Sequence, residues 1–253
     1  MSEEVLVSAA NGILEVTINR PEQRNAMTKH AAERIAEAMD RLDAENELRC
    51  AILTGADGTF CAGMDLKGFL KGELPVAGDR GFGGLTSWTP KKPIIAAVDG
   101  FALAGGMELA LACDMIVANS KAKFGIPEAK RGLVAAGGGV VQLPRLLPRP
   151  LAMELALTGD PIEATRAYEL GLVNRITDGP AIEVARELAA SIAENGPLAL
   201  IASKGIIRDS WLWPIEEIND YQNPYIAHIF SSEDAKEGAR AFAEKRKPNW
   251  QSR

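Results

Sequence analysis

Residues 92–128 read KPIIAAVDGFALAGGMELALACDMIVANSKAKFGIPE, and this stretch decides the fold. Its apolar run Ile94–Val98 is typical of a buried strand, and a glycine-rich turn follows it. The segment Gly106–Cys113 then consists of apolar residues and glycine, with Glu108 as the one exception. Because a helix that is apolar all round is buried, the stretch predicts a strand, a tight turn and a buried helix that carries a carboxylate.

Two carboxylates and a glycine turn in this stretch suggest proton chemistry. Burial without a partner raises the pKa of a carboxyl group such as Glu108 toward neutrality, where it can exchange protons. Glu128 follows Pro127 at an expected helix start, and the turn at Gly105 and Gly106 offers N–H groups to a developing oxyanion. Three plainer interpretations stay open. Glu108 could be a structural acid paired with a cation, Glu128 could complement a helix dipole, and the glycines could be ordinary turn residues.

Composition argues against several other classes of protein. The chain has 253 residues, 47% of them hydrophobic and 25% charged, which is ordinary for a globular protein. A net charge of −6 argues against a nucleic-acid partner, which usually requires a basic face. No apolar run approaches the ~20 residues of a membrane span, and the start MSEEVLV lacks the pattern of a signal peptide. We therefore expect a cytoplasmic protein with no membrane partner.

Cysteine and histidine are too few for several kinds of site. Cys50, Cys61 and Cys113 have no paired spacing, so we expect reduced thiols rather than disulfides or a zinc site. The only histidines are His30 and His228, which supply a metal site or a Ser–His–Asp triad poorly. We therefore expect no bound metal ion.

Strand, glycine turn and helix recur along the chain, which favours an α/β architecture. The expected strands are Ile13–Asn19, Cys50–Thr54, Ile94–Val98, Asp114–Ala118 and Val173–Ile176. The expected helices run from the N-cap Thr28 to about Asn46, from near Asp65, and over Gly106–Cys113, Leu151–Thr158, Ile162–Leu170 and Ala181–Glu194, with another after the glycines at 137–139.

Two segments depart from this pattern. The glycine-rich stretch Gly68–Gly84 is expected to be a loop, either a mobile lid that faces substrate or a disordered insertion. Beyond Pro197 only helices are expected, and Leu198–Lys247 is rich in large aromatic side chains. Such side chains need a surface to pack on, which favours a neighbouring subunit, with the chain's own core as the alternative.

Five segments in order resemble the crotonase superfamily, also called the enoyl-CoA hydratase/isomerase family, over essentially the full length. The segments are FCAGMDLK (60–67), KPIIAAVDGFALAGGMELALACD (92–114), FGIPEAKRGL (124–133), LTGDPIEATRAYELGLVN (157–174) and EDAKEGARAFAEKRKPNW (233–250). The first and last look closest to carnitinyl-CoA dehydratase and actinobacterial-type hydratases. The resemblance implies a core of repeated ββα turns over residues 1–197. It also implies a helical region over 198–253 that forms trimers, or hexamers built from two trimers.

The resemblance also implies an active site. The N–H after the A-G dipeptide of the first loop, here that of Met64, forms half of an oxyanion hole in the family. A glycine three residues before the helix carboxylate, here Gly105, gives the second N–H. Family hydratases use two glutamates, and Glu108 and Glu128 fill both positions. One departure is Ala136, where hydratases commonly have glycine, and its methyl group could crowd the water.

The family binds coenzyme A as part of its substrate, and the resemblance implies no metal or redox cofactor. The matching positions in the first loops are Arg24, Ala26, Ala62, Asp65 and Lys67, and Lys245 of the C-terminal segment could reach a CoA phosphate from another subunit. The expected function is enoyl-CoA hydratase, the reversible addition of water to a 2-enoyl-CoA. The alternatives are a carnitinyl-CoA dehydratase-like activity, an enoyl-CoA isomerase and, in another class, a non-catalytic acyl-CoA-binding protein.

Overall fold

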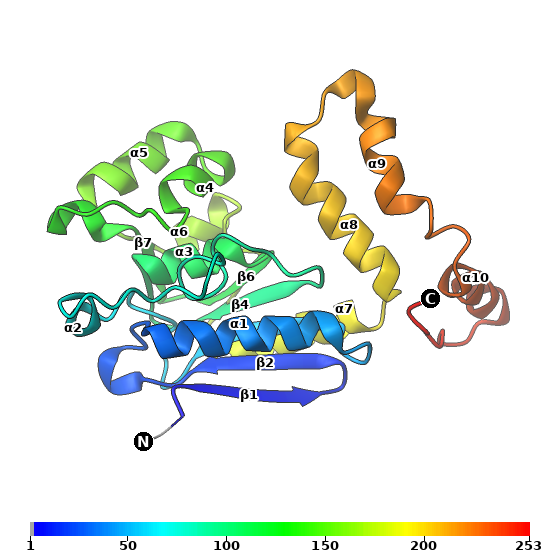
Figure 1. The fold of residues 1–253 in the computed structure, drawn as a ribbon, viewed down its shortest axis with the longest axis horizontal. Coiled ribbons are helices and arrows are strands. Elements are labelled where there is room, and N and C mark those ends of the chain that lie inside the picture. Colours follow the sequence, from blue (N-terminus) through cyan, green and yellow to red (C-terminus); the bar gives the residue numbers. More distant parts are fainter. Residues whose placement is uncertain (1–2) are drawn as a thin grey trace.

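The computed structural model describes residues 3–253 and shows two sheets with helices around them (Figure 1). The larger sheet has the strand order β1 (Val5–Ala10), β2 (Ile13–Ile18), β3 (Cys50–Gly55), β4 (Ile94–Val98), β6 (Met115–Asn119) and β9 (Arg175–Thr177). The smaller sheet consists of β5 (Phe101–Leu103), β7 (Lys123–Gly125) and β8 (Ile162–Glu163). β1 pairs antiparallel with β2, and the other pairs of the larger sheet are parallel.

Ten α-helices and four short 3₁₀ helices accompany these strands within residues 3–253, and six of these helices follow the last strand, β9. The α-helices are α1 (Lys29–Ala44), α2 (Leu66–Phe69), α3 (Gly105–Ala112), α4 (Gly139–Leu146), α5 (Arg149–Thr158), α6 (Ala164–Glu169), α7 (Ala181–Ala193), α8 (Pro197–Asp209), α9 (Ile218–Ile226) and α10 (Glu233–Glu244). The 3₁₀ helices are η1 (Pro21–Gln23), η2 (Pro127–Arg131), η3 (Ser210–Leu212) and η4 (Ile215–Glu217). No helix of this described part is long and apolar enough to cross a membrane.

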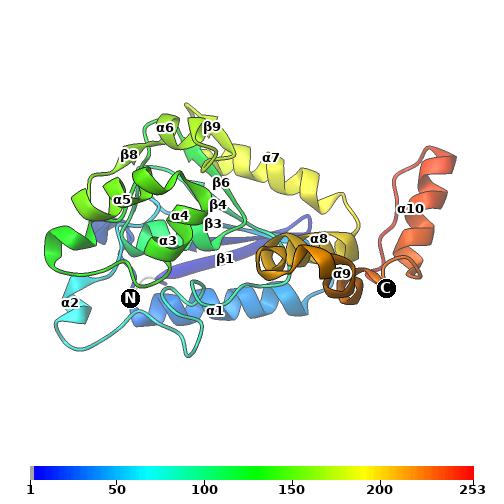
Figure 2. The same ribbon diagram turned by 90° about the horizontal axis from the view of Figure 1, so that it is seen from above.

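The central strands β3 and β4 of the larger sheet are buried on both faces, and their side chains alternate between two cores. Leu53 belongs to the core that includes Met39 of α1, whereas its neighbour Ile52 packs with Ala185 of α7. Figure 2 shows α1 and α7 on opposite sides of the sheet. Burial of each large aliphatic side chain contributes roughly 1.5–3 kcal/mol, so the two faces together hold the strands that carry the site.

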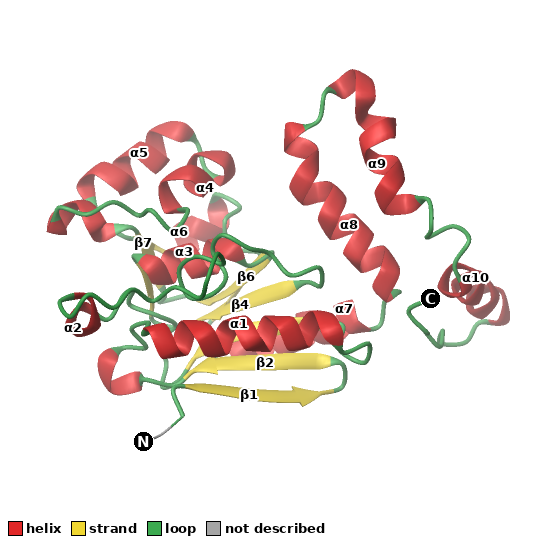
Figure 3. Cartoon of the chain, in the orientation of Figure 1, coloured by secondary structure: helices red, strands yellow, loops and turns green. Residues whose placement is uncertain are grey.

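The chain winds between the two sheets in repeated turns, as Figure 3 shows. β4 lies in the larger sheet, β5 follows in the smaller one, and α3 completes the turn. β6 and β7 repeat this step. In the preceding turn, Cys61 lies between β3 and α2 in the chain. It forms a parallel bridge to Ala102 of β5. This arrangement confirms the predicted α/β core of ββα turns.

Most of the predicted elements are present, and the errors concern short strands. β2, β3, β4, β6, α1, α3, α5 and α7 match their predictions to within a few residues. The prediction of one helix over Ile162–Leu170 is wrong at its start, because Ile162 and Glu163 pair with β7 as β8. The strands β1, β5 and β7 have no counterpart among the predictions.

The C-terminal helices extend away from the rest of the molecule. In Figures 1 and 2, α8, α9 and α10 project from the sheet on the side opposite α2. Trp213 stacks on Tyr221 with 5.8 Å between ring centroids, but Trp211, Leu212, Ile215 and Phe230 are largely exposed. The alternative that this aromatic surface packs on the chain's own core is therefore wrong.

Candidate active site

The first candidate oxyanion donor, the N–H of Met64, lies in a loop held by the segment after η1. Met27 donates its N–H to the carbonyl oxygen of Gly63 at 2.8 Å, and Asp65 donates its N–H to the carbonyl oxygen of Met27 at 3.0 Å. Successive peptide groups of an extended strand point to opposite sides. The N–H of Met64 therefore points away from Met27, and it has no hydrogen-bond partner within residues 3–253.

The second candidate donor, the N–H of Gly105, stands at the start of α3. Ala104 precedes it with φ 53° and ψ −127°, a backbone conformation that non-glycine residues adopt at a cost of about 1–3 kcal/mol. Ala104 is fixed there because its N–H bonds the carbonyl oxygen of Gly125 at 2.9 Å. The resulting turn leaves the N–H of Gly105 without an acceptor in the described part of the chain.

The two candidate donors belong to neighbouring loops. A Cβ added at Gly63, next to Met64, would lie 2.8 Å from Cβ of Ala104 and 3.5 Å from the nitrogen of Gly105. Gly63 has φ +107°, so glycine suits both its conformation and this close approach. The structure thus brings the loops of Met64 and Gly105 together, at the positive end of the α3 dipole.

Glu108 is buried in α3 and held by a glycine loop. Its side chain is 5% exposed, and Oε1 accepts the N–H of Gly139 at 2.9 Å. A Cβ added at Gly137 would lie 2.6 Å from Oε2, so only glycine permits this approach. Burial raises the pKa of Glu108 to about 7; the N–H groups of Gly139 and Gly137 lower it, and the charge of Glu128 raises it. The interpretation of Glu108 as an acid paired with a cation is wrong, because no salt bridge to it occurs in residues 3–253.

Glu128 lies in η2 and faces the same site. Its Oε2 is buried and has no hydrogen-bond partner among the described residues. Burial raises its pKa above the ordinary value, and its own backbone N–H and the charge of Arg131 offset this only in part. This raised pKa does not fit the interpretation of Glu128 as a charge that only complements a helix dipole, which would favour the ionised form.

Ala136 differs from its expected role. Its N–H donates to the carbonyl oxygen of Val134 at 2.8 Å, and its side chain is exposed. The backbone groups that contact Glu108 come from Gly137 and Gly139 instead. Whether the Ala136 methyl group crowds the water stays a prediction.

Phe82 is a site residue that the sequence analysis missed. A Cβ added at Gly105 would lie only 2.2 Å from Cζ of Phe82, so the ring rests directly on this glycine. A Cβ at Gly137 would lie 3.2 Å from Cβ of Phe82. Phe82 therefore stands between the candidate oxyanion donor and the loop that holds Glu108. A single aromatic residue between glycines offers no periodic signal that could have identified it.

The loop that carries Phe82 is packed onto the core. The guanidinium group of Arg80 lies 3.9 Å from the ring centroid of Trp88 and bonds the carbonyl oxygen of Ala36 in α1. Leu85 is fully buried, and a Cβ at Gly84 would lie 2.3 Å from the carbonyl oxygen of Ala32. This part of Gly68–Gly84 is not a disordered insertion.

Most of the candidate CoA-binding residues gather around the Met27–Met64 bridge. Ala62 donates its N–H to the carbonyl oxygen of Arg24 at 3.0 Å, Ala26 precedes Met27, and Asp65 caps α2 beside the exposed Lys67. Lys245 is not among them, because it follows α10, which lies at the opposite end of the molecule from α2 (Figure 1).

No group of three or more His, Cys, Asp or Glu side chains within residues 3–253 is arranged to hold a metal ion.

Comparison with known proteins gives consistent results. A family described as enoyl-CoA hydratase/isomerase matches residues 8–253. Enoyl-CoA hydratase EchA19 of Mycobacterium tuberculosis is 43% identical, over 99% of this chain and 97% of that protein. Carnitinyl-CoA dehydratase of Salmonella typhi is also 43% identical, over the full length of both chains. A crystal structure of an enoyl-CoA hydratase from M. tuberculosis H37Rv superposes with a TM-score of 0.97 at 52% identity, covering 99% of each chain.

Proposed function

Because this chain belongs to the enoyl-CoA hydratase/isomerase family, we propose that it is an enoyl-CoA hydratase. It adds water across the C2=C3 bond of a 2-enoyl-CoA and gives a 3-hydroxyacyl-CoA, and the reaction is reversible. The observation that carries the proposal is the pair of the buried Glu108 and the half-buried Glu128, both with a raised pKa, beside two backbone N–H groups that have no acceptor within residues 3–253. Coenzyme A enters as part of the substrate, and the proposal assigns no further cofactor.

The N–H groups of Met64 and Gly105 stabilise the thioester oxygen. As water adds to C3, negative charge moves through C2 onto this oxygen, and two fixed donors lower the energy of the resulting enolate. Loss of one such donor typically costs roughly 3–4 kcal/mol of transition-state stabilisation. The positive end of the α3 dipole adds to the effect at Gly105.

The two glutamates hold the water and exchange the proton at C2. The charge of one raises the pKa of the other, so the pair shares one proton near neutral pH and titrates as a unit. In the hydration direction one carboxylate takes a proton from water as its oxygen bonds to C3, and the other carboxyl group gives a proton to C2. The unpartnered Oε2 of Glu128 accepts a hydrogen bond from that water.

Replacement of each glutamate by glutamine tests this mechanism. Glu108→Gln and Glu128→Gln keep size and hydrogen bonding but remove the base, so each should lower kcat for hydration of crotonyl-CoA about 10²-fold or more. Because both glutamates act on one water, the kcat of the double variant should be little lower than that of the single variant with the lower kcat. Glu154→Gln, at an exposed position of α5, is the control and should leave kcat unchanged. Hydration by Glu108→Gln at a rate near wild type would refute the proposal.

A carnitinyl-CoA dehydratase-like activity is the second candidate, favoured by the full-length relative of that name. A panel of enoyl-CoA esters that includes crotonobetainyl-CoA separates the two by their kcat/KM values. A 3-enoyl-CoA in the same panel tests for isomerisation, which needs no water; Glu128→Gln that retained only this activity would favour an isomerase. Binding of every ester without turnover would favour an acyl-CoA-binding protein.

The exposed aromatic surface of η3 and α9 supports assembly into a trimer, or a hexamer of two trimers, with residues 198–253 as the assembly region. Lys245 lies far from α2 of its own chain, so it would reach a CoA phosphate only in a neighbouring subunit. The three cysteines are free and buried, which suits a reducing, cytoplasmic setting.

A further inference from the structure

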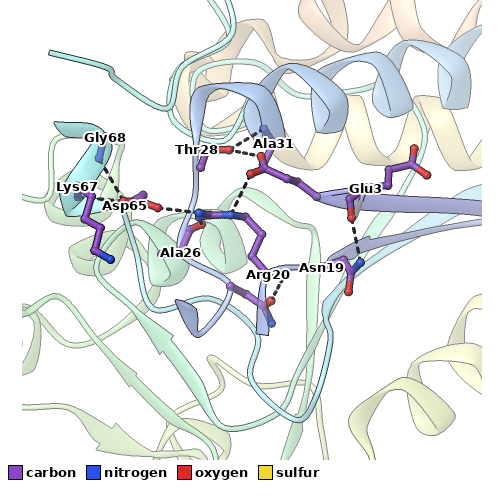
Figure 4. Close-up of polar contacts among 11 residues, drawn as sticks. Glu3, Asn19, Arg20, Ala26, Thr28, Ala31, Asp65, Lys67 and Gly68 are labelled. Atoms are coloured by element: carbon purple, nitrogen blue, oxygen red, sulfur yellow. Dashed lines mark hydrogen bonds and ion pairs between the residues drawn. The ribbon is translucent and has the colours of Figure 1, made fainter. Parts of the chain in front are cut away.

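Arg20 joins three parts of the chain next to the loop of Met64 (Figure 4). Its Nε lies 3.1 Å from a carboxylate oxygen of Glu4, and one terminal nitrogen lies 2.8 Å from Oδ2 of Asp65. Its other terminal nitrogen donates to the carbonyl oxygen of Ala26. The side chains of Arg20 and Asp65 are 13% and 14% exposed, so water screens this ion pair less than a surface pair.

Asp65 uses its other carboxylate oxygen within the loop. Oδ1 accepts the N–H groups of Lys67 at 2.9 Å and Gly68 at 3.2 Å, which caps the start of α2. Burial raises the pKa of Asp65, but the hydrogen bonds from Arg20 and from these N–H groups outweigh it and hold the pKa below its ordinary value. The carboxylate is therefore ionised at neutral pH and fixed from two sides.

The residues that Arg20 holds flank the bridge between Met27 and Met64. Ala26 directly precedes Met27, and Asp65 directly follows Met64. The direction of the Met64 N–H depends on the peptide plane between Gly63 and Met64, and the bridge fixes the peptides on either side of Met64. Because the bridge is parallel, Ala26 and Asp65 lie at its opposite ends, and Arg20 ties the chain before Met27 to the chain after Met64.

A second anchor keeps Arg20 itself in place. Its backbone N–H donates to Oδ1 of Asn25 at 2.8 Å, and Asn25 is fully buried with φ 56°. Nδ2 of Asn25 in turn donates to the carbonyl oxygen of Ala56 at 2.9 Å. The planar guanidinium group suits three acceptors in different directions, whereas the ammonium group of lysine is a single point charge.

We propose that Arg20 is a positioning residue, which acts through Asp65 and Ala26 to aim the Met64 N–H at the thioester oxygen. This inference rests on the proposed function, because it assigns that N–H to the oxyanion hole. An oxyanion donor acts only where it meets the charge that develops, and a misplacement of about 1 Å can cost 10²-fold in rate. Arg20 itself need not touch the substrate.

The test compares Arg20→Gln, Arg20→Lys and Asp65→Asn with wild type. We expect Arg20→Gln and Asp65→Asn to lower kcat for crotonyl-CoA by about 10-fold to 10²-fold, with KM changed less than about threefold. Arg20→Lys should fall between Arg20→Gln and wild type. The control is Arg186→Gln, which removes a bidentate pair with Glu15 at 2.7 and 2.8 Å on α7 and should change neither constant.

A second readout separates positioning from a general loss of structure. Infrared spectra of bound, carbonyl-labelled butanoyl-CoA, a saturated analogue that cannot be hydrated, report how strongly the donors polarise the thioester carbonyl. In the wild type the stretching frequency should fall on binding, and in Arg20→Gln and Asp65→Asn it should return toward the value of the free ester. The Arg20→Gln/Asp65→Asn double variant should have a kcat no lower than that of the less active single variant, because both substitutions break the same ion pair between Arg20 and Asp65.

The proposal is overturned if folded Arg20→Gln and Asp65→Asn keep kcat within twofold of wild type and leave the carbonyl frequency unchanged. Should Arg20→Gln not fold, Asp65→Asn decides by the same two measurements. If the wild-type protein polarises the thioester carbonyl but hydrates no ester, the hydratase assignment is contradicted. The infrared comparison of the Arg20 variants would then still test the role of Arg20. Normal hydration by both variants would contradict the role of Arg20 alone.

Discussion

Glu108 links the stability of the fold to pH at the scale of one residue. Its pKa is about 7 in the folded protein, above the value near 4.5 of an ordinary glutamate. Between these values the folded state binds more protons than the unfolded state, so stability falls as pH rises through this range. The ionised carboxylate therefore destabilises the fold above pH 7, by at most about 3 kcal/mol.

We expect Glu108→Gln to be more stable than wild type at pH 8, because glutamine removes this ionisation. At pH 5, where Glu108 is largely protonated in the folded state, the gain should be small. Urea unfolding at both values measures it, with Glu154→Gln as a control that shows no such trend. A stability difference that stays constant between pH 5 and pH 8 would contradict the prediction.

The contact between Phe82 and Gly105 gives a second prediction at this scale. Gly105→Ala keeps the backbone N–H but places a methyl group 2.2 Å from the present position of Cζ of Phe82. The displaced ring or turn should lower kcat for hydration about 10²-fold. Removal of the ring in the double variant Gly105→Ala/Phe82→Ala should restore at least about a tenth of the wild-type kcat. Equal loss in the single and double variants would show that the ring is not the cause.

At the scale of elements, two glycines of the loop before β4, Gly78 and Gly84, differ in how closely other atoms approach them. Gly84 and Gly78 both have positive φ, +69° and +55°, so alanine is strained at either position. A Cβ at Gly84 would also lie 2.3 Å from the carbonyl oxygen of Ala32 in α1, whereas a Cβ at Gly78 would meet no atom within 4 Å.

This difference predicts unequal effects of the same substitution in one loop. Gly78→Ala should cost about 1 kcal/mol of unfolding free energy from backbone strain alone. Gly84→Ala should cost at least 2 kcal/mol more, or expose the loop to protease, because the overlap with α1 forces a shift. Chemical denaturation and limited proteolysis measure both. Equal losses in the two variants would mean that the loop does not depend on its contact with α1.

The elements with a strong pattern could be predicted from the sequence, and the short ones could not. The apolar run of β4 predicts its bounds, and the apolar stripe and Thr28 predict α1 and its N-cap. β5 and β7 have three residues each, too few to show a period, and they depend on pairing between turns of the spiral. Their formation is a tertiary effect that local sequence does not encode.

The same division holds for the site. Glu108 is conspicuous as a charge in an apolar helix, so its burial and raised pKa follow from the sequence. The glycine turn at Gly105 suggests one candidate donor, whereas the N–H of Met64 has no side-chain signature and only the family resemblance indicates it. Arg20 and Phe82 gain their contacts through residues that are distant in sequence, Asp65 and Gly105, which no local pattern brings together.

At the scale of the whole molecule, the exposed apolar side chains predict where subunits meet. Leu212 of η3 is 82% exposed beside the exposed Trp211 and Ile215, whereas Leu70 after α2 is 85% exposed on the far side of the molecule. We expect Leu212→Glu to shift the mass in solution from the oligomer to the monomer, since it buries a charge in the proposed interface. Leu70→Glu should leave the oligomer intact. Light scattering after size-exclusion chromatography compares them, and an unchanged mass for Leu212→Glu would contradict the proposed interface.

The position of α8–α10 after the core in the chain has a consequence for synthesis. A ribosome adds about 5–20 residues per second, so residues 198–253 follow the completed core by several seconds. Both sheets can close during that interval, because β9 and α7 have already been made. Nascent chains on one messenger RNA should therefore expose the aromatic surface of η3 and α9 only after their catalytic cores have folded, which would keep premature association between neighbouring chains low.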